Sequence, residues 1–165
     1  MGSRASAASR AARYVWPILA VAVAAGIFFS SSMPGEDSGE ASMSIIAKML
    51  EWFPSIPFGE DTLNFILRKG AHFTVYLILA FCVTHSLKYY SKGRRLAFLS
   101  WGIAAFYGVT DEIHQYFVPG RACTVSDMLI NAAGAAAGTG LVLLWLLYRK
   151  RHIVEGSDSS NHENT

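Results

Sequence analysis

Residues 111–138 read DEIHQYFVPGRACTVSDMLINAAGAAAG, and apolar runs lie on both sides of this stretch. Pro119 and Gly120 favour a tight turn between two helical segments. Ionisable groups at the edge of a membrane helix are costly and by default indicate a functional site. The stretch therefore predicts a helical hairpin with a candidate site near its turn. The polar residues of that site are Asp111, Glu112, His114, Gln115, Arg121, Asp127 and Asn131.

The composition is that of a membrane protein. Of the 165 residues, 52% are hydrophobic and only 16% are charged, whereas about a quarter of the residues of a soluble domain are charged. The net charge of +2 is not gathered into a basic patch, so nucleic acid is not an expected partner. Cys82 and Cys123 lack zinc-binding spacing and are predicted to stay unpaired.

Four apolar segments are long enough to cross a membrane as helices. They lie at about residues 14–32, 70–87, 96–117 and 125–148. Residues 1–12 and 152–165 are predicted to be disordered tails, which leaves 13–151 as one four-helix transmembrane domain. The first connection contains a segment with apolar residues at helical spacing, residues 42–53, which is too short to span. We expect it to lie on the membrane interface with Trp52 and Phe53 at headgroup level.

The basic residues predict the orientation, because cytoplasmic segments of membrane proteins are enriched in Lys and Arg. With a cytoplasmic N-terminus, ten of the 14 Lys and Arg residues fall on the inner side. Only Lys48, Arg68, Lys69 and Arg121 fall outside. We therefore expect a multi-pass protein of the plasma membrane with both termini in the cytoplasm.

Helical spacing brings the polar residues of three spans to one depth near the outer face. Lys69, His72 and Tyr76 share a face of the second span, since they lie at positions i, i+3 and i+7. Asp111 and Gln115 share a face at the outer end of the third span, with Glu112 beside them and His114 directed away. Asp127 and Asn131 follow the same rule at the outer end of the fourth span.

Small residues continue the Asp127–Asn131 stripe down the fourth span. Gly134 and Gly138 form a small-xxx-small pattern, which lets helix backbones approach closely. Ala104 and Gly108 offer a smooth strip on the third span. We expect the third and fourth spans to pack along these strips, with Asp111 and Glu112 opposite Asp127 and Asn131.

An ordered set of motifs over roughly residues 28–140 resembles the VanZ-like family of bacterial membrane proteins. The motifs are Phe29-Ser30-Ser31, Lys69-x-x-His72-x-x-x-Tyr76, Asp111-Glu112-x-x-Gln115-x-Phe117, Arg121, and Asp127-x-x-x-Asn131-x-x-Gly134-x-x-x-Gly138. The family takes its name from a member linked to low-level resistance to the glycopeptide teicoplanin. The resemblance implies a small helical protein of the bacterial cell membrane and an effect on the cell envelope.

The polar cluster favours a site for an envelope lipid or a lipid-linked cell-wall precursor. Candidates for acid–base catalysis are His72, Asp111, Glu112 and Asp127. Candidates for ligand binding are Lys69, Tyr76, Gln115, Arg121 and Asn131. No compact metal-binding spacing such as HExxH occurs, and neither a metal nor a cofactor is predicted.

The alternative is a non-catalytic binding or scaffold protein whose polar cluster is structural. Buried charges need partners, and Arg121 could pair with Asp127 or Glu112. Lys69 could pair with Asp111 in the same way. Thr124 or Ser126 could cap the fourth span.

Overall fold

The computed structural model describes the backbone of residues 2–162 and the side chains of residues 13–152. This part of the chain is α-helical with short connections and contains no β-strand, which confirms the all-α fold class. Its helices are α1 (Gly2–Ser31), α2 (Gly35–Trp52), α3 (Glu60–Leu87), α4 (Gly93–Tyr116) and α5 (Val125–His162).

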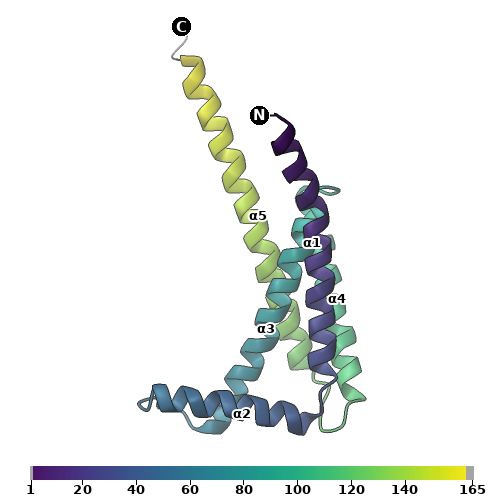
Figure 1. Cartoon of the computed structure of the whole chain (residues 1–165), viewed down its shortest axis with the longest axis vertical. Helices are drawn as coiled ribbons and strands as arrows, with labels where there is room; N and C mark the ends of the chain where they lie inside the picture. Colours follow the sequence, from purple (N-terminus) through teal and green to yellow (C-terminus); the bar gives the residue numbers. More distant parts are fainter. Residues whose placement is uncertain (1, 163–165) are drawn as a thin grey trace.

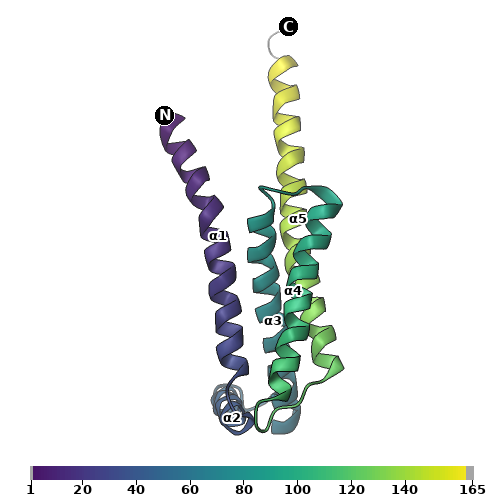
Figure 2. The ribbon, with the colours of Figure 1, turned by 90° about the vertical axis from the view of Figure 1, so that its right-hand side faces the viewer.

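Four of the helices run along the long axis of the molecule, and α2 lies across one end of them (Figure 1). The direction alternates from α1 to α3, α4 and α5, so the first and last described turns lie at the end opposite α2 (Figures 1 and 2). Helix α3 contacts all four other helices, whereas no contact joins α1 to α5 within the described residues. The bundle is therefore organised around α3.

Three helical segments are long and apolar enough to cross a membrane within the described part of the chain: Arg13–Ser31, Glu60–Leu87 and Val125–His152. Helix α4, which covers residues 96–116 of the predicted span 96–117, is not among them. Its 24 residues suffice in length, but Arg94 and Arg95 lie at one end and Asp111 and Glu112 at the other. A fourth span at α4 stays a prediction.

The helix across the end of the bundle is longer than the sequence predicts. The predicted segment covers residues 42–53, whereas α2 begins at Gly35. Glu36 and Asp37 lie in its first turn, where negative charge is favoured by the helix dipole. The hydroxyl of Ser42 donates to Asn64 Oδ1 at 2.8 Å, which fixes α2 to α3. Trp52 is 77% exposed, and its place at headgroup level remains a prediction.

The connection after α4 is locked to the start of α2. The N–H of Gly35 donates to the Pro119 carbonyl at 2.9 Å. A Cβ at Gly35 would overlap the carbonyl group of Gly120, and Gly120 itself has φ +72°. Glycine is needed at both positions, because one requires close backbone approach and the other a left-handed conformation.

The glycine stripe of α5 packs against α3, not against α4 as the sequence analysis expects. A Cβ on Gly134 would overlap the carbonyl of Phe73, and one on Gly138 would overlap the carbonyl of Leu77. The predicted α4–α5 contact does exist, but the close approach of α4 lies nearer the N-terminus of α5 than the two glycines do. A Cβ on Gly108 would lie 2.9 Å from Cβ of Asn131.

The predicted disordered tails, residues 1–12 and 152–165, fall on the outer turns of α1 and α5 and stay a prediction. The backbone is helical from Gly2 onward and up to His162, while residues 1 and 163–165 lie outside the described part. Because α1 starts at Gly2, Pro17 lies inside the helix and not in its first turns. The two cysteines are free as predicted.

Candidate functional site

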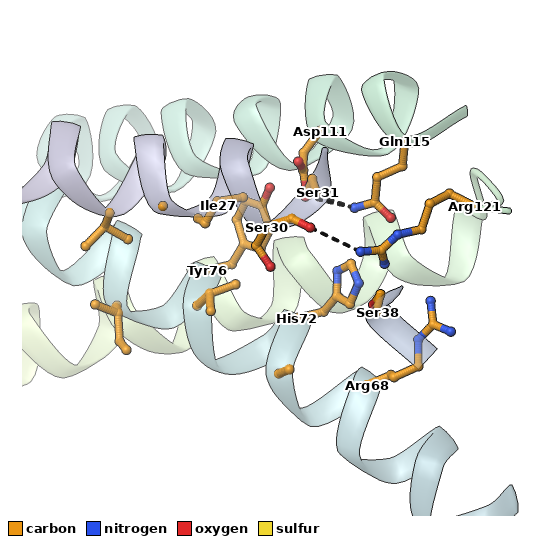
Figure 3. A pocket seen from close by; sticks show the side chains of 15 residues that line it. Ile27, Ser30, Ser31, Ser38, Arg68, His72, Tyr76, Asp111, Gln115 and Arg121 are labelled. Atoms are coloured by element: carbon orange, nitrogen blue, oxygen red, sulfur yellow. Dashed lines mark hydrogen bonds between the residues drawn. The ribbon is translucent and has the colours of Figure 1, made fainter. Parts of the chain in front are cut away.

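Polar side chains from α3, α4, α5 and the α4–α5 connection gather at the end of the bundle that α2 covers. This arrangement agrees with the expected convergence of polar side chains from three helices. Figure 3 shows part of it, with His72 and Tyr76 on α3 facing Asp111, Gln115 and Arg121. Tyr76 and Glu112 are completely buried, so the cluster reaches into the bundle interior.

His72 is the centre of a contact between three helices. Its Nδ1 lies 3.1 Å from Asn131 Oδ1 on α5 and 3.6 Å from Glu112 Oε1 on α4. Both neighbours are acceptors, so Nδ1 carries the proton and Nε2 is left for other partners. A histidine held beside a carboxylate in this way can donate or accept a proton at its free nitrogen.

Three buried polar atoms around His72 have no hydrogen-bond partner among the described residues: Tyr76 Oη, Glu112 Oε1 and Asn131 Nδ2. The other carboxylate oxygen of Glu112 accepts the N–H of Thr124 at 3.4 Å. An unsatisfied buried polar group costs about 1–3 kcal/mol. Stability alone therefore does not explain this part of the cluster.

Lys69 and Asp127 form an ion pair between α3 and α5. The suggested pair of Lys69 with Asp111 is therefore wrong. Asp127 also accepts the Thr124 hydroxyl at 2.6 Å, and its N–H donates to Thr124 Oγ1 at 3.2 Å. Thr124 is thus the predicted N-cap of α5. Lys69 and Asp127 thus neutralise each other and hold the start of α5 against α3.

Arg121 is held by main-chain oxygens. The predicted pairing of Arg121 with Asp127 or Glu112 is therefore wrong. The Nε of Arg121 donates to the Met33 carbonyl at 3.2 Å, and its Nη2 donates to the Ser30 carbonyl at 3.1 Å. Burial and the nearby positive charge of Arg68 lower the pKa of Arg121. A guanidinium group stays protonated in proteins, so its charge is fixed in place without a carboxylate partner.

Gln115 joins the end of α4 to the end of α1. Its Nε2 donates to Ser31 Oγ and to Asp111 Oδ2, both at 3.2 Å. His114 is directed away from this group, as predicted, since its Nε2 lies 3.1 Å from the Ser32 hydroxyl. All four long helices therefore contribute to the region, although the sequence analysis assigns it to three.

Two cavities meet at this region. The first, of about 330 Å³, lies between α1 and α3 and has apolar walls that include Val23, Ile27 and Val75. Its polar end contains His72 and Asp111 (Figure 3). The second, of about 370 Å³, is lined mainly by polar residues of α3 and the α4–α5 connection. Both are lined by Arg68, His72 and Gln115.

Some residues of this region are absent from the predicted site. Arg68 precedes His72 by four positions on α3, so helical spacing could have identified it. Ser30 and Ser31 occur in the family motif quoted above. Ser38 on α2 lines the first cavity and carries no sequence signal. Within the described residues, no group of three or more His, Cys, Asp or Glu side chains is placed to hold a metal ion.

Comparison with protein families matches residues 16–147 to the family described as VanZ/LLP1. This match confirms the resemblance inferred from the motifs. No curated protein and no solved structure matches the chain. Every residue of the candidate site lies inside the matched range.

Proposed function

The chain belongs to the VanZ/LLP1 family, and we propose that it binds an envelope lipid or a lipid-linked cell-wall precursor at the outer leaflet of the bacterial plasma membrane. In this proposal the protein crosses the membrane four times with both termini in the cytoplasm. The excess of basic residues near the termini and in the α3–α4 connection supports that orientation. The proposed effect on teicoplanin susceptibility rests on the family resemblance.

The observation that carries the proposal is the cavity between α1 and α3. Its walls are apolar along the helices and polar at one end, as an amphiphilic ligand requires. Val23 and Ile27 come from α1, whereas Val75 comes from α3. Because these helices would face lipid on the outside of the bundle, a ligand can enter sideways from the bilayer. Its headgroup then reaches His72 and Arg121.

Gly26 offers a way to fill this cavity without disturbing the fold. It lines the first cavity, and a Cβ built on it meets no atom within 4 Å. The substitution Gly26→Phe therefore places a ring in the apolar part of the cavity. Gly102 on α4 is the matched control, since its Cβ also meets nothing within 4 Å and it lines neither cavity.

We expect Gly26→Phe to reduce co-purified lipid about tenfold, which corresponds to ~1.4 kcal/mol of binding free energy. Gly102→Phe should leave it unchanged. The measurement is mass spectrometry of lipids released from protein purified in neutral detergent, together with the teicoplanin susceptibility of strains that produce each variant. If Gly26→Phe retains the lipid content of the wild type, the cavity is not a ligand site and the polar cluster is structural.

A further inference from the structure

We propose that the headgroup of this ligand contains a phosphodiester, which lies where the two cavities meet, between Arg68, Arg121 and His72. Its aliphatic side then occupies the first cavity, and its polar alcohol occupies the second. The inference rests on the proposed function and names the class of ligand that the site would take.

The charges around the junction favour an anion. Arg68 is exposed and makes no ion pair or hydrogen bond among residues 13–152. Arg121 uses two N–H groups for the Ser30 and Met33 carbonyls, which leaves three of its five donors free. Against these two cations, the first cavity is lined by one carboxylate, that of Asp111. The lining of the first cavity therefore carries one net positive charge before His72 is counted, while Asp61 and Asp127 line only the second cavity, together with Arg68 and Lys69.

Lys69 does not share this role, although it is the neighbour of Arg68. Its ammonium group is neutralised by Asp127 in the ion pair between α3 and α5. It lines the second cavity but not the first. The cations available at the junction are therefore the two arginines, whose planar groups match phosphate oxygens.

His72 supplies a third contact from a different direction. Its Nδ1 faces Asn131 and Glu112, so Nε2 is the nitrogen left for the ligand. With a second proton on Nε2, the ring would donate from Nδ1 toward Glu112 and from Nε2 to the anion, a charge-assisted arrangement. Three donors from α3 and the α4–α5 connection suit a tetrahedral group with several oxygens better than a flat carboxylate.

The second cavity indicates what is attached to the other side of the phosphate. Its lining includes Asp61, Asn64 and Thr124, whose carboxylate, amide and hydroxyl groups hydrogen-bond to alcohols. A second anionic group there would meet the carboxylates of Asp61 and Asp127. An uncharged, hydroxyl-bearing alcohol is therefore the favoured substituent. With an aliphatic chain in the first cavity, this makes the central phosphate a diester.

The test compares ligands that differ in one feature. The full chain in neutral detergent, stripped of lipid, is titrated with dioleoyl phosphatidylglycerol, dioleoyl phosphatidic acid, dioleoylglycerol, oleate and inorganic phosphate. Binding is followed by native mass spectrometry. We expect phosphatidylglycerol to bind about tenfold tighter than dioleoylglycerol or oleate, a difference of ~1.4 kcal/mol. Phosphatidic acid should be intermediate, and inorganic phosphate should bind weakest because it lacks a chain.

Arg68→Gln is the decisive variant, because it removes no intramolecular contact seen in the structure. It should lower the affinity for phosphatidylglycerol several-fold and leave that for dioleoylglycerol unchanged. The control is Arg95→Gln, which replaces an exposed arginine near the N-terminus of α4 that lines neither cavity. Equal affinity for phosphatidylglycerol, oleate and dioleoylglycerol, or an unaffected Arg68→Gln variant, overturns the phosphate assignment. The proposed function fails separately, if no amphiphile binds better to wild type than to Gly26→Phe.

Discussion

On one side of α3, helix α5 comes so close that Gly134 and Gly138 have no room for a side chain, whereas on the other side α1 leaves a cavity of about 330 Å³. Glycine occurs on both sides of α3, but its role differs between them. On α5 it permits contact between backbones. On α1, Gly26 borders open space.

The difference shows how a small bundle can combine a rigid site with an accessible one. Asn131, Gly134 and Gly138 lie on one stripe of α5, at positions i, i+3 and i+7. The close approach of the two backbones therefore places Asn131 beside His72. The looser helix, α1, closes the other side of the cavity. A site held by tightly packed elements is positioned more accurately than one on a mobile segment.

The largest expected effect comes from breaking the tight side. Gly134→Leu forces a side chain into the main chain of Phe73, and we expect a loss of more than ~3 kcal/mol, since overpacking alone costs about 1–3 kcal/mol. Thermal unfolding in detergent measures this. Gly26→Leu is the control, and it should unfold at or slightly above the wild-type temperature because glycine is a poor helix former. Equal stability of the two variants would refute the comparison.

A smaller effect is expected from the ion pair that joins α3 to α5. Lys69→Met leaves the carboxylate of Asp127 with the Thr124 hydroxyl as its remaining side-chain partner, and the loss of a partly buried charged partner should cost about 2 kcal/mol. The double variant Lys69→Met/Asp127→Asn should be less unstable than the sum of the single variants, by ~1 kcal/mol. Strict additivity in a thermal double-mutant cycle would show that the pair does not couple the helices.

The smallest effect is expected on the loose side. The hydroxyl of Tyr107 on α4 donates to the Ala24 carbonyl of α1 at 2.7 Å. Tyr107→Phe removes this bond and should cost about 1 kcal/mol. Hydrogen exchange should rise in α1 and stay unchanged in α5, because within the described part of the chain α1 contacts α3 and α4 but not α5. Tyr116→Phe, at a side chain that is 70% exposed, is the control.

The sequence predicts which residues converge better than it predicts their partners. Helical spacing places Lys69, His72 and Tyr76 on one face of α3, and the structure agrees. A glycine stripe likewise indicates that some backbone comes close to α5. It does not say which helix that backbone belongs to. The predicted neighbour is α4, whereas the observed neighbour is α3. Periodicity defines a face of one helix, while the choice of neighbour depends on the packing of all of them.

The partners of the charged residues were less predictable for a similar reason. Lys69 had several carboxylates within plausible reach, and only the helix positions select Asp127. Arg121 binds the carbonyls of Ser30 and Met33, and a carbonyl group leaves no mark in the sequence because every residue has one. For this reason the sequence did not predict that the end of α1 contributes to the site.

That attachment of Arg121 has a consequence for how the protein can evolve. The oxygens that hold the guanidinium belong to the main chain, so mutations at positions 30 and 33 can exchange one side chain for another and still present the same two acceptors. The position of Arg121 therefore does not depend on which side chains stand at positions 30 and 33.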